Sequence, residues 1–79
     1  MKRKEISPEH IVLMQELGKR IKKLRTEKKI GYVQMSVDIG LSKNAYNDIE
    51  HANAYCNFSS LLLIANYHGV SISTLMKDL

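Results

Sequence analysis

The chain has 79 residues, of which 44% are hydrophobic and 25% are charged, which is typical of an ordinary globular domain and excludes a disordered or low-complexity chain. This length allows one compact core but no elaborate catalytic cleft, so function is expected on the surface. The net charge of +4 is unevenly distributed, with +6 on residues 1–30 and −2 on residues 31–79. This mild basic bias favours a polyanionic partner.

The sequence contains one cysteine and no long apolar segment. Cys56 cannot form an internal disulfide, which favours a reduced cytoplasmic protein. The longest apolar run, residues 61–65, is too short to span a bilayer or to drive export. We therefore expect a cytoplasmic location and no membrane association.

Residues 1–6 are predicted to form a flexible basic arm ahead of a helical domain over residues 7–79. Ser7-Pro8-Glu9 combines a capping hydroxyl, a proline suited to a first helical turn and an acid favoured by the helix dipole. Apolar residues then recur at helical spacing to about Lys28, namely Leu13, Leu17, Ile21 and Leu24. The first helix is therefore predicted to be unusually long.

Two short helices are predicted between Tyr32 and His51. In the first of them, Met35 and Ile39 lie four residues apart, and Gly40 is placed where a left-handed residue ends a helix. Ser42 can cap the second, whose apolar stripe is expected to contain Ala45, Tyr46 and Ile49. Two short helices joined by Gly-Leu-Ser form a helix-turn-helix pattern, here over residues 32–51.

A fourth helix is predicted from Phe58 to His68, between a capping Asn57 and a terminating Gly69. Its apolar residues 61–65 face every direction around a helix, so we expect it to be buried nearly all round, at the centre of the fold. Ser71 can cap a last short helix. The sequence thus predicts an all-α fold of five helices.

The helix that follows Ser42 has a polar face with groups suited to reading bases. At about 100° per residue, four polar residues gather on one side of it, namely Asn44, Asn47, Asp48 and His51. Asn can pair with adenine, Lys with the guanine acceptors and Asp with the cytosine amino group. Because any surface helix has a polar face, a merely solvated face is the alternative.

Several segments, at their mutual spacings, resemble the Cro and phage-repressor type of helix-turn-helix domain, the XRE family of bacterial regulators. They are LGKRIKKLR at residues 17–25, residues 35–42, YNDIE at residues 46–50, and residues 61–71. The resemblance covers about residues 17–76. It implies a compact five-helix, lambda-repressor-like domain with an extended first helix, acting as a sequence-specific DNA-binding transcriptional regulator, most simply a repressor.

The resemblance also assigns roles to individual residues. It places the helix after Ser42 in the major groove of double-stranded DNA, where the base-facing residues are Lys43, Asn44 and Asp48. At the DNA backbone or beside the groove we expect Tyr32, Ser42, Asn47, His51, Lys28 and Lys29. It further pairs Arg25 with Glu50 in a partly buried ion pair that ties the first helix to the recognition helix.

The chain departs from the family pattern at this interface. Tyr32 stands where the family usually has Gln, and the loop after the third helix lacks the basic residues that are common there. The carboxylate of Asp48 repels phosphate unless a cytosine or nearby cations compensate it, and Lys2, Arg3 and Lys4 of the arm can supply part of that charge. A protein-interaction module with weak DNA affinity, such as an antitoxin partner or an adaptor, is therefore the alternative function.

Some apolar residues have no obvious place in one small core, which indicates an interface. Relatives commonly pair through the C-terminal helix and read two half-sites about one DNA turn apart, so we expect a two-fold homodimer. Its surface is expected at Leu63, Tyr67, Met76 and Leu79. The early turns of the first helix are a second possibility, and packing within the monomer is the alternative.

No residue pattern indicates catalysis or metal binding. The histidines and Cys56 lack the paired spacings of a structural zinc site, and no nucleophile has a predicted acid or base beside it. We therefore expect no metal, no cofactor and no enzymatic activity. His68 stands where the family has an apolar side chain, and its charge is expected to be favourable at the C-terminal end of its helix.

Overall fold

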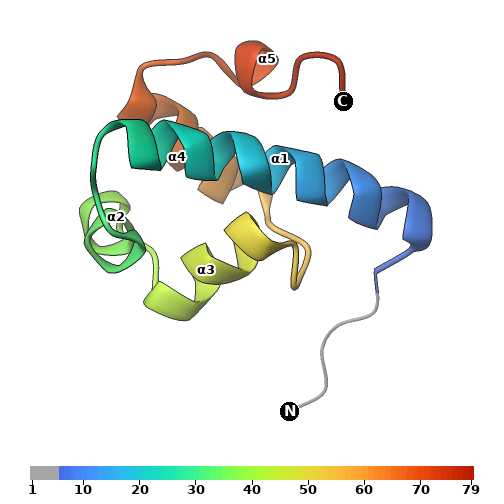
Figure 1. Ribbon diagram of the computed structural model, residues 1–79, viewed down its shortest axis with the longest axis horizontal. Helices are drawn as coiled ribbons and strands as arrows, with labels where there is room; N and C mark the ends of the chain where they lie inside the picture. Colours follow the sequence, from blue (N-terminus) through green and yellow to red (C-terminus); the bar gives the residue numbers. More distant parts are fainter. Residues whose placement is uncertain (1–5) are drawn as a thin grey trace.

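The computed structural model describes residues 6–79, so most of the expected basic arm lies outside the described residues. The helices, in chain order, are α1 (Pro8–Glu27), α2 (Tyr32–Ile39), α3 (Lys43–His51), α4 (Phe58–His68) and α5 (Ile72–Leu75). No residue from 6 to 79 lies in a strand. The predicted all-α fold with a long first helix is confirmed (Figure 1).

Local capping sets the helix boundaries where the sequence predicted them. At the start of α3, the hydroxyl of Ser42 accepts a hydrogen bond from the amide of Ala45, at 3.0 Å. At the end of α2, Gly40 has a φ of 79°, which lies in the left-handed region that glycine adopts without a Cβ clash. The remaining helices have side-chain N-caps of the same kind, provided by Ser7, Asn57 and Ser71.

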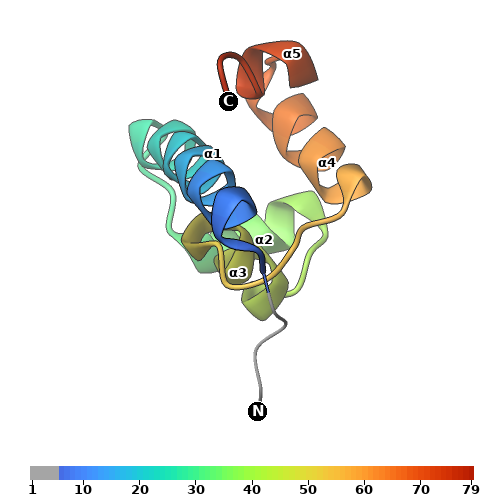
Figure 2. The same ribbon diagram turned by 90° about the vertical axis from the view of Figure 1, so that its right-hand side faces the viewer.

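The helices enclose one core, with α1 lying between the helix-turn-helix and α5. Figure 2 shows α2 and α3 on one side of α1, and α5 on the other. α1 packs most extensively against α3 and also contacts α5, while α4 contacts α2 and α5. The buried apolar side chains come from all five helices: Leu17, Ile21, Met35, Ile39, Tyr46, Ile49, Leu61, Ile64, Ala65 and Leu75.

α4 is not buried all round, so that prediction was wrong. Leu61 and Ile64 face the core, but Leu62 and Leu63 are 46% and 43% exposed. A domain of this size has too few elements to surround a helix, and α2 and α5 cover only part of α4. Apolar residues of α4 are therefore not all buried, and one side of this helix presents apolar groups to solvent.

α1 and α3 approach each other so closely at Gly18 that no side chain fits between them. A Cβ at this position would overlap the carbonyl oxygen of Glu50 and would lie 2.9 Å from that of Ile49. A glycine inside a helix costs about 1 kcal/mol relative to alanine. Here the close packing of α3 onto α1 requires it.

None of the described helices has the length and apolar character needed to cross a membrane.

Candidate nucleic-acid interface

A two-pronged ion pair fixes α3 against α1. Arg25 Nε donates to Glu50 Oε2 at 2.7 Å, and Arg25 Nη2 donates to Glu50 Oε1 at 3.0 Å. The third nitrogen, Nη1, donates to the carbonyl oxygen of Ile30 at 2.8 Å. One guanidinium therefore joins α1, the turn that precedes α2, and α3. The ion pair that the resemblance implied is present in the structure.

Burial makes this cluster strong. The side chain of Glu50 is only 1% exposed and that of Arg25 is 12% exposed. The hydroxyl of Tyr46 also donates to Glu50 Oε2. The hydrogen bond to Glu50 raises the pKa of Arg25. The pKa of Tyr46 is raised chiefly by burial and secondly by its hydrogen bond to Glu50. Arg25 therefore stays charged and Tyr46 stays a neutral donor across the physiological range.

The polar residues of α3 outside this cluster are accessible to solvent to different degrees. Lys43, Asn44 and His51 are exposed, whereas Asn47 and Asp48 are half-buried. Most of these side chains are short and end in hydrogen-bonding groups, which suits contact with base edges. The predicted polar face is therefore accessible.

Ala45 was predicted on the apolar stripe of α3, and this was wrong. Tyr46 and Ile49 are buried, but Ala45 is exposed. Successive residues of a helix are about 100° apart, so the neighbour of a buried residue can lie outside the stripe. Ala45 therefore adds a small apolar group to the solvent-accessible surface of the helix, where it lines a hollow together with Asp48.

Asp48 borders the open face instead of standing at its centre. It lines a shallow hollow between α3 and the connection to α4, together with Tyr55 and Cys56. Burial raises the pKa of the Cys56 thiol, which keeps it protonated and unreactive. The half-buried Asp48 is thus less prominent than Asn44, although it still places a carboxylate beside the proposed contact surface of α3.

His51 has a defined tautomer. Its Nδ1 lies 2.9 Å from the carbonyl oxygen of Asn47, and because a carbonyl can only accept, Nδ1 must carry the hydrogen. In the neutral ring, Nε2 is then an acceptor and cannot donate to a phosphate. Protonation of the ring turns Nε2 into a charged donor.

The other residues predicted to contact the DNA backbone differ in their exposure and in the groups they already contact. Tyr32 begins α2 and is 38% exposed, while the Ser42 hydroxyl serves as the N-cap of α3. The Nζ of Lys28 lies 5.9 Å from the ring centroid of Tyr67, a cation–π distance, which directs Lys28 toward α4. Lys29 is exposed.

The four predicted dimer residues also differ. Leu63 and Met76 are 43% and 37% exposed, so both are accessible. Tyr67 and Leu79 are half-buried and pack against the monomer core. The hydroxyl of Tyr67 also donates to Asp38 at 3.4 Å, so this ring already joins α4 to α2.

The two ring nitrogens of His68 are buried. Neither ring nitrogen has a hydrogen-bond partner among the described residues. Burial, with a contribution from Lys28, lowers the pKa of His68. The expectation of a favourable charge at the end of α4 was wrong, because the surroundings favour the neutral ring.

Among residues 6–79, no group of three or more His, Cys, Asp and Glu side chains is arranged to hold a metal ion.

The fold and the accessible α3 define a helix-turn-helix protein, and comparison with known proteins identifies the family. A family model described as a helix-turn-helix domain matches residues 18–78, which is most of the chain. The chain therefore belongs to this family, and the resemblance to the XRE type is confirmed. At the level of the family, its class of function is DNA binding in transcription regulation.

Among solved structures, the chain is similar to ComR from Streptococcus suis, with a TM-score of 0.73 and 28% sequence identity. The similarity covers 84% of this chain but only 22% of the ComR chain, so this chain spans about a fifth of that protein. The comparison with curated proteins gives no match.

Proposed function

We propose that the domain over residues 7–79 is a sequence-specific DNA-binding regulator that inserts α3 into the major groove. The two-sided construction of α3 supports this most. Tyr46 and Glu50 hold one side of the helix, and Asn44 lies on the open side. The major groove is wide enough for an α-helix, and the early residues of such a helix reach base edges. A rigidly held helix presents these side chains in a fixed orientation.

The roles we propose follow the chemistry of each side chain. Lys43 and Asn44 read guanine and adenine, and Asp48 contacts a cytosine amino group. The residues proposed at the phosphates or beside the groove are Tyr32, Ser42, Asn47, His51, Lys28 and Lys29. Of the two lysines, Lys29 is the stronger candidate, because Lys28 lies over Tyr67.

Selection of duplexes from a random pool at low salt tests this proposal. An enriched consensus is expected, and Asn44→Ala should relax it at one position, at a cost of about 1–3 kcal/mol. Lys29→Gln should weaken binding to all sequences alike and reduce the salt slope by about 1. Lys77→Gln is the matched control, because it follows α5 on the other side of α1 (Figure 2). Absence of any consensus would refute sequence-specific binding.

We further propose that the domain binds as a two-fold homodimer and represses transcription in the cytoplasm by occluding a promoter. Leu63 and Met76 are exposed apolar groups in the C-terminal half, where an interface between copies would remove them from water. Sedimentation should show a dimer that Leu63→Glu dissociates, and selected sites should contain half-sites about one DNA turn apart. A monomer at hundreds of micromolar would remove the dimer from the proposal.

The second candidate is a protein-interaction module with weak DNA affinity. Asp48 beside the open face of α3 favours it, because a carboxylate there opposes phosphate. Such a module would bind all duplexes equally and weakly, while recovering one stoichiometric protein partner.

A further inference from the structure

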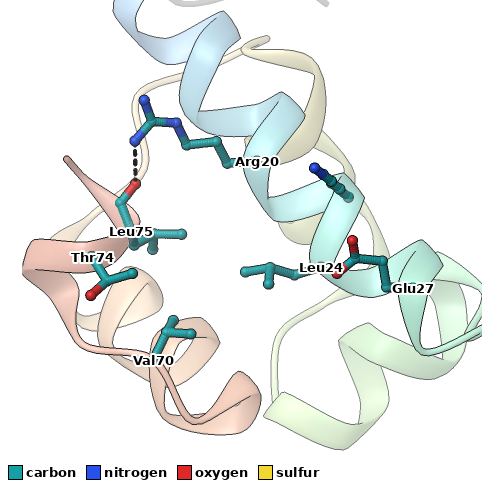
Figure 3. Close-up of a pocket in the computed structure, with 7 residues that line it drawn as sticks. Arg20, Leu24, Glu27, Val70, Thr74 and Leu75 are labelled. Carbon is teal, nitrogen blue, oxygen red and sulfur yellow. Dashed lines mark hydrogen bonds between the residues drawn. The ribbon is translucent and has the colours of Figure 1, made fainter. Parts of the chain in front are cut away.

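A groove is lined by residues of α1, of the connection between α4 and α5, and of α5. α5 lies on the opposite side of α1 from α3 (Figure 1). It has a volume of about 250 Å³. Figure 3 shows the side chains of Leu24, Val70 and Leu75 directed into the space between these elements. The floor of the groove is therefore apolar.

Cations line one wall of the groove. Arg20 Nη1 donates to the carbonyl oxygen of Leu75 at 3.0 Å, which holds the guanidinium at the end of the groove (Figure 3). Lys23, which is exposed, lies one helical turn further along α1, and Glu27 is the one acidic residue in the lining. Lys19 and Lys22 continue the exposed basic surface of α1 beyond the groove.

The size of the groove limits what it can bind. Pockets for drug-sized molecules typically have volumes of about 300–1,000 Å³, so this groove is too small and too open for such a ligand. It is large enough for one bulky apolar side chain, and anchor residues of protein interfaces commonly fill pockets of this kind. The basic wall selects carboxylates as the neighbours of that side chain.

We propose that this groove binds an acidic amphipathic segment of a partner protein. An apolar side chain of the partner enters between Leu24, Val70 and Leu75, and its flanking carboxylates lie beside Arg20 and Lys23. Because α1 separates the groove from α3, the partner leaves the recognition helix free. This interaction goes beyond DNA binding and does not depend on it.

The test is an NMR titration of the full ¹⁵N-labelled chain with a synthetic helical peptide of Leu, Glu and Ala, whose leucines share one face. Amide shifts are expected at Leu24, Val70 and Leu75. Lys23→Glu should weaken binding about fivefold. Lys22→Glu is the matched control, because it makes the same charge change at the adjacent exposed residue outside the lining, and it should weaken binding less than twofold.

Two variant peptides separate the apolar part of the contact from the ionic part. A peptide with Ser in place of Leu and one with Lys in place of Glu should both fail to shift the groove residues. Thr74→Trp, at an exposed position in the lining, should block the groove while the far-ultraviolet circular dichroism remains that of the folded chain.

The proposal is overturned if the shifts lie on α3 or on the outer side of α4, if the basic peptide binds equally well, or if the two lysine variants behave alike. Self-association that Lys23→Glu abolishes would also overturn it, because a second copy of the chain would then be the occupant. None of these outcomes bears on selection of a DNA consensus, so the DNA-binding proposal is tested separately.

Discussion

Replacing Arg25 by Met removes the cation that faces the buried carboxylate of Glu50 while keeping much of the side-chain volume. The variant loses both bonds from the guanidinium to Glu50 and the bond to the carbonyl of Ile30. Glu50, whose side chain is 1% exposed, keeps only the hydroxyl of Tyr46 as a donor. An unpaired charge is then left inside the domain.

Removing one partner of a buried ion pair costs about 3–5 kcal/mol. Because Tyr46 still donates to the carboxylate, we expect the lower end of this range, about 3 kcal/mol. A domain of 79 residues has a stability of about 4–12 kcal/mol, so this loss is a large fraction of the total. The melting temperature should fall by about 12–24 °C.

Urea unfolding followed by circular dichroism at neutral pH measures this effect. Adding Glu50→Gln to Arg25→Met should recover about 1 kcal/mol or more, because the amide oxygen still accepts from Tyr46 but carries no charge. The pair Arg20–Glu16, whose side chains are 28% and 51% exposed and whose Nε and Oε2 lie 3.5 Å apart, is the control, and Glu16→Gln should cost less than about 0.5 kcal/mol. If Arg25→Met costs as little as Glu16→Gln, or if Glu50→Gln adds to the loss, the reasoning fails.

Three further predictions follow from single residues. Gly18→Ala should lower stability in urea by about 1–3 kcal/mol, because its Cβ would meet backbone atoms of α3; a gain in stability would contradict this close contact. Burial lowers the folded-state pKa of His68 below about 6.5, so its contribution to stability is present above about pH 6.5 and lost as pH falls toward the folded pKa. His68→Leu should therefore flatten the decline in melting temperature between about pH 7 and pH 5, and an unchanged decline would exclude His68 as its cause. Duplex affinity, measured by fluorescence anisotropy, should fall by about 1 kcal/mol for all sequences alike in His51→Ala, because the exposed His51 is proposed at the phosphates or beside the groove; a loss confined to one base position would contradict that placement.

The helix boundaries were predictable from the sequence because they depend on neighbouring residues. A capping hydroxyl such as that of Ser42, or a glycine such as Gly40, fixes the end of a helix by local hydrogen bonds and backbone conformation. The exposed side of α3 was also predicted, apart from Ala45, because its residues follow the helical period.

Properties that depend on distant elements were not predictable in this way. The exposure of Leu62 depends on how few helices surround α4, and no periodicity in α4 contains that information. The bond between Arg25 and Glu50 joins residues 25 positions apart, and only the family resemblance indicated it. A glycine inside the long first helix is the one local feature that could have indicated the close approach at Gly18.

Along α3, the residues that hold the helix are buried, whereas the residues that meet DNA in our proposal are exposed or half-buried. Substitutions on an exposed surface usually change stability by no more than about 0.5 kcal/mol, whereas changes at the buried Tyr46 or Glu50 act on the whole domain. Lys43 and Asn44 can therefore diverge, by mutation or by design, without loss of the fold. Target preference and foldability are consequently free to evolve independently in this helix.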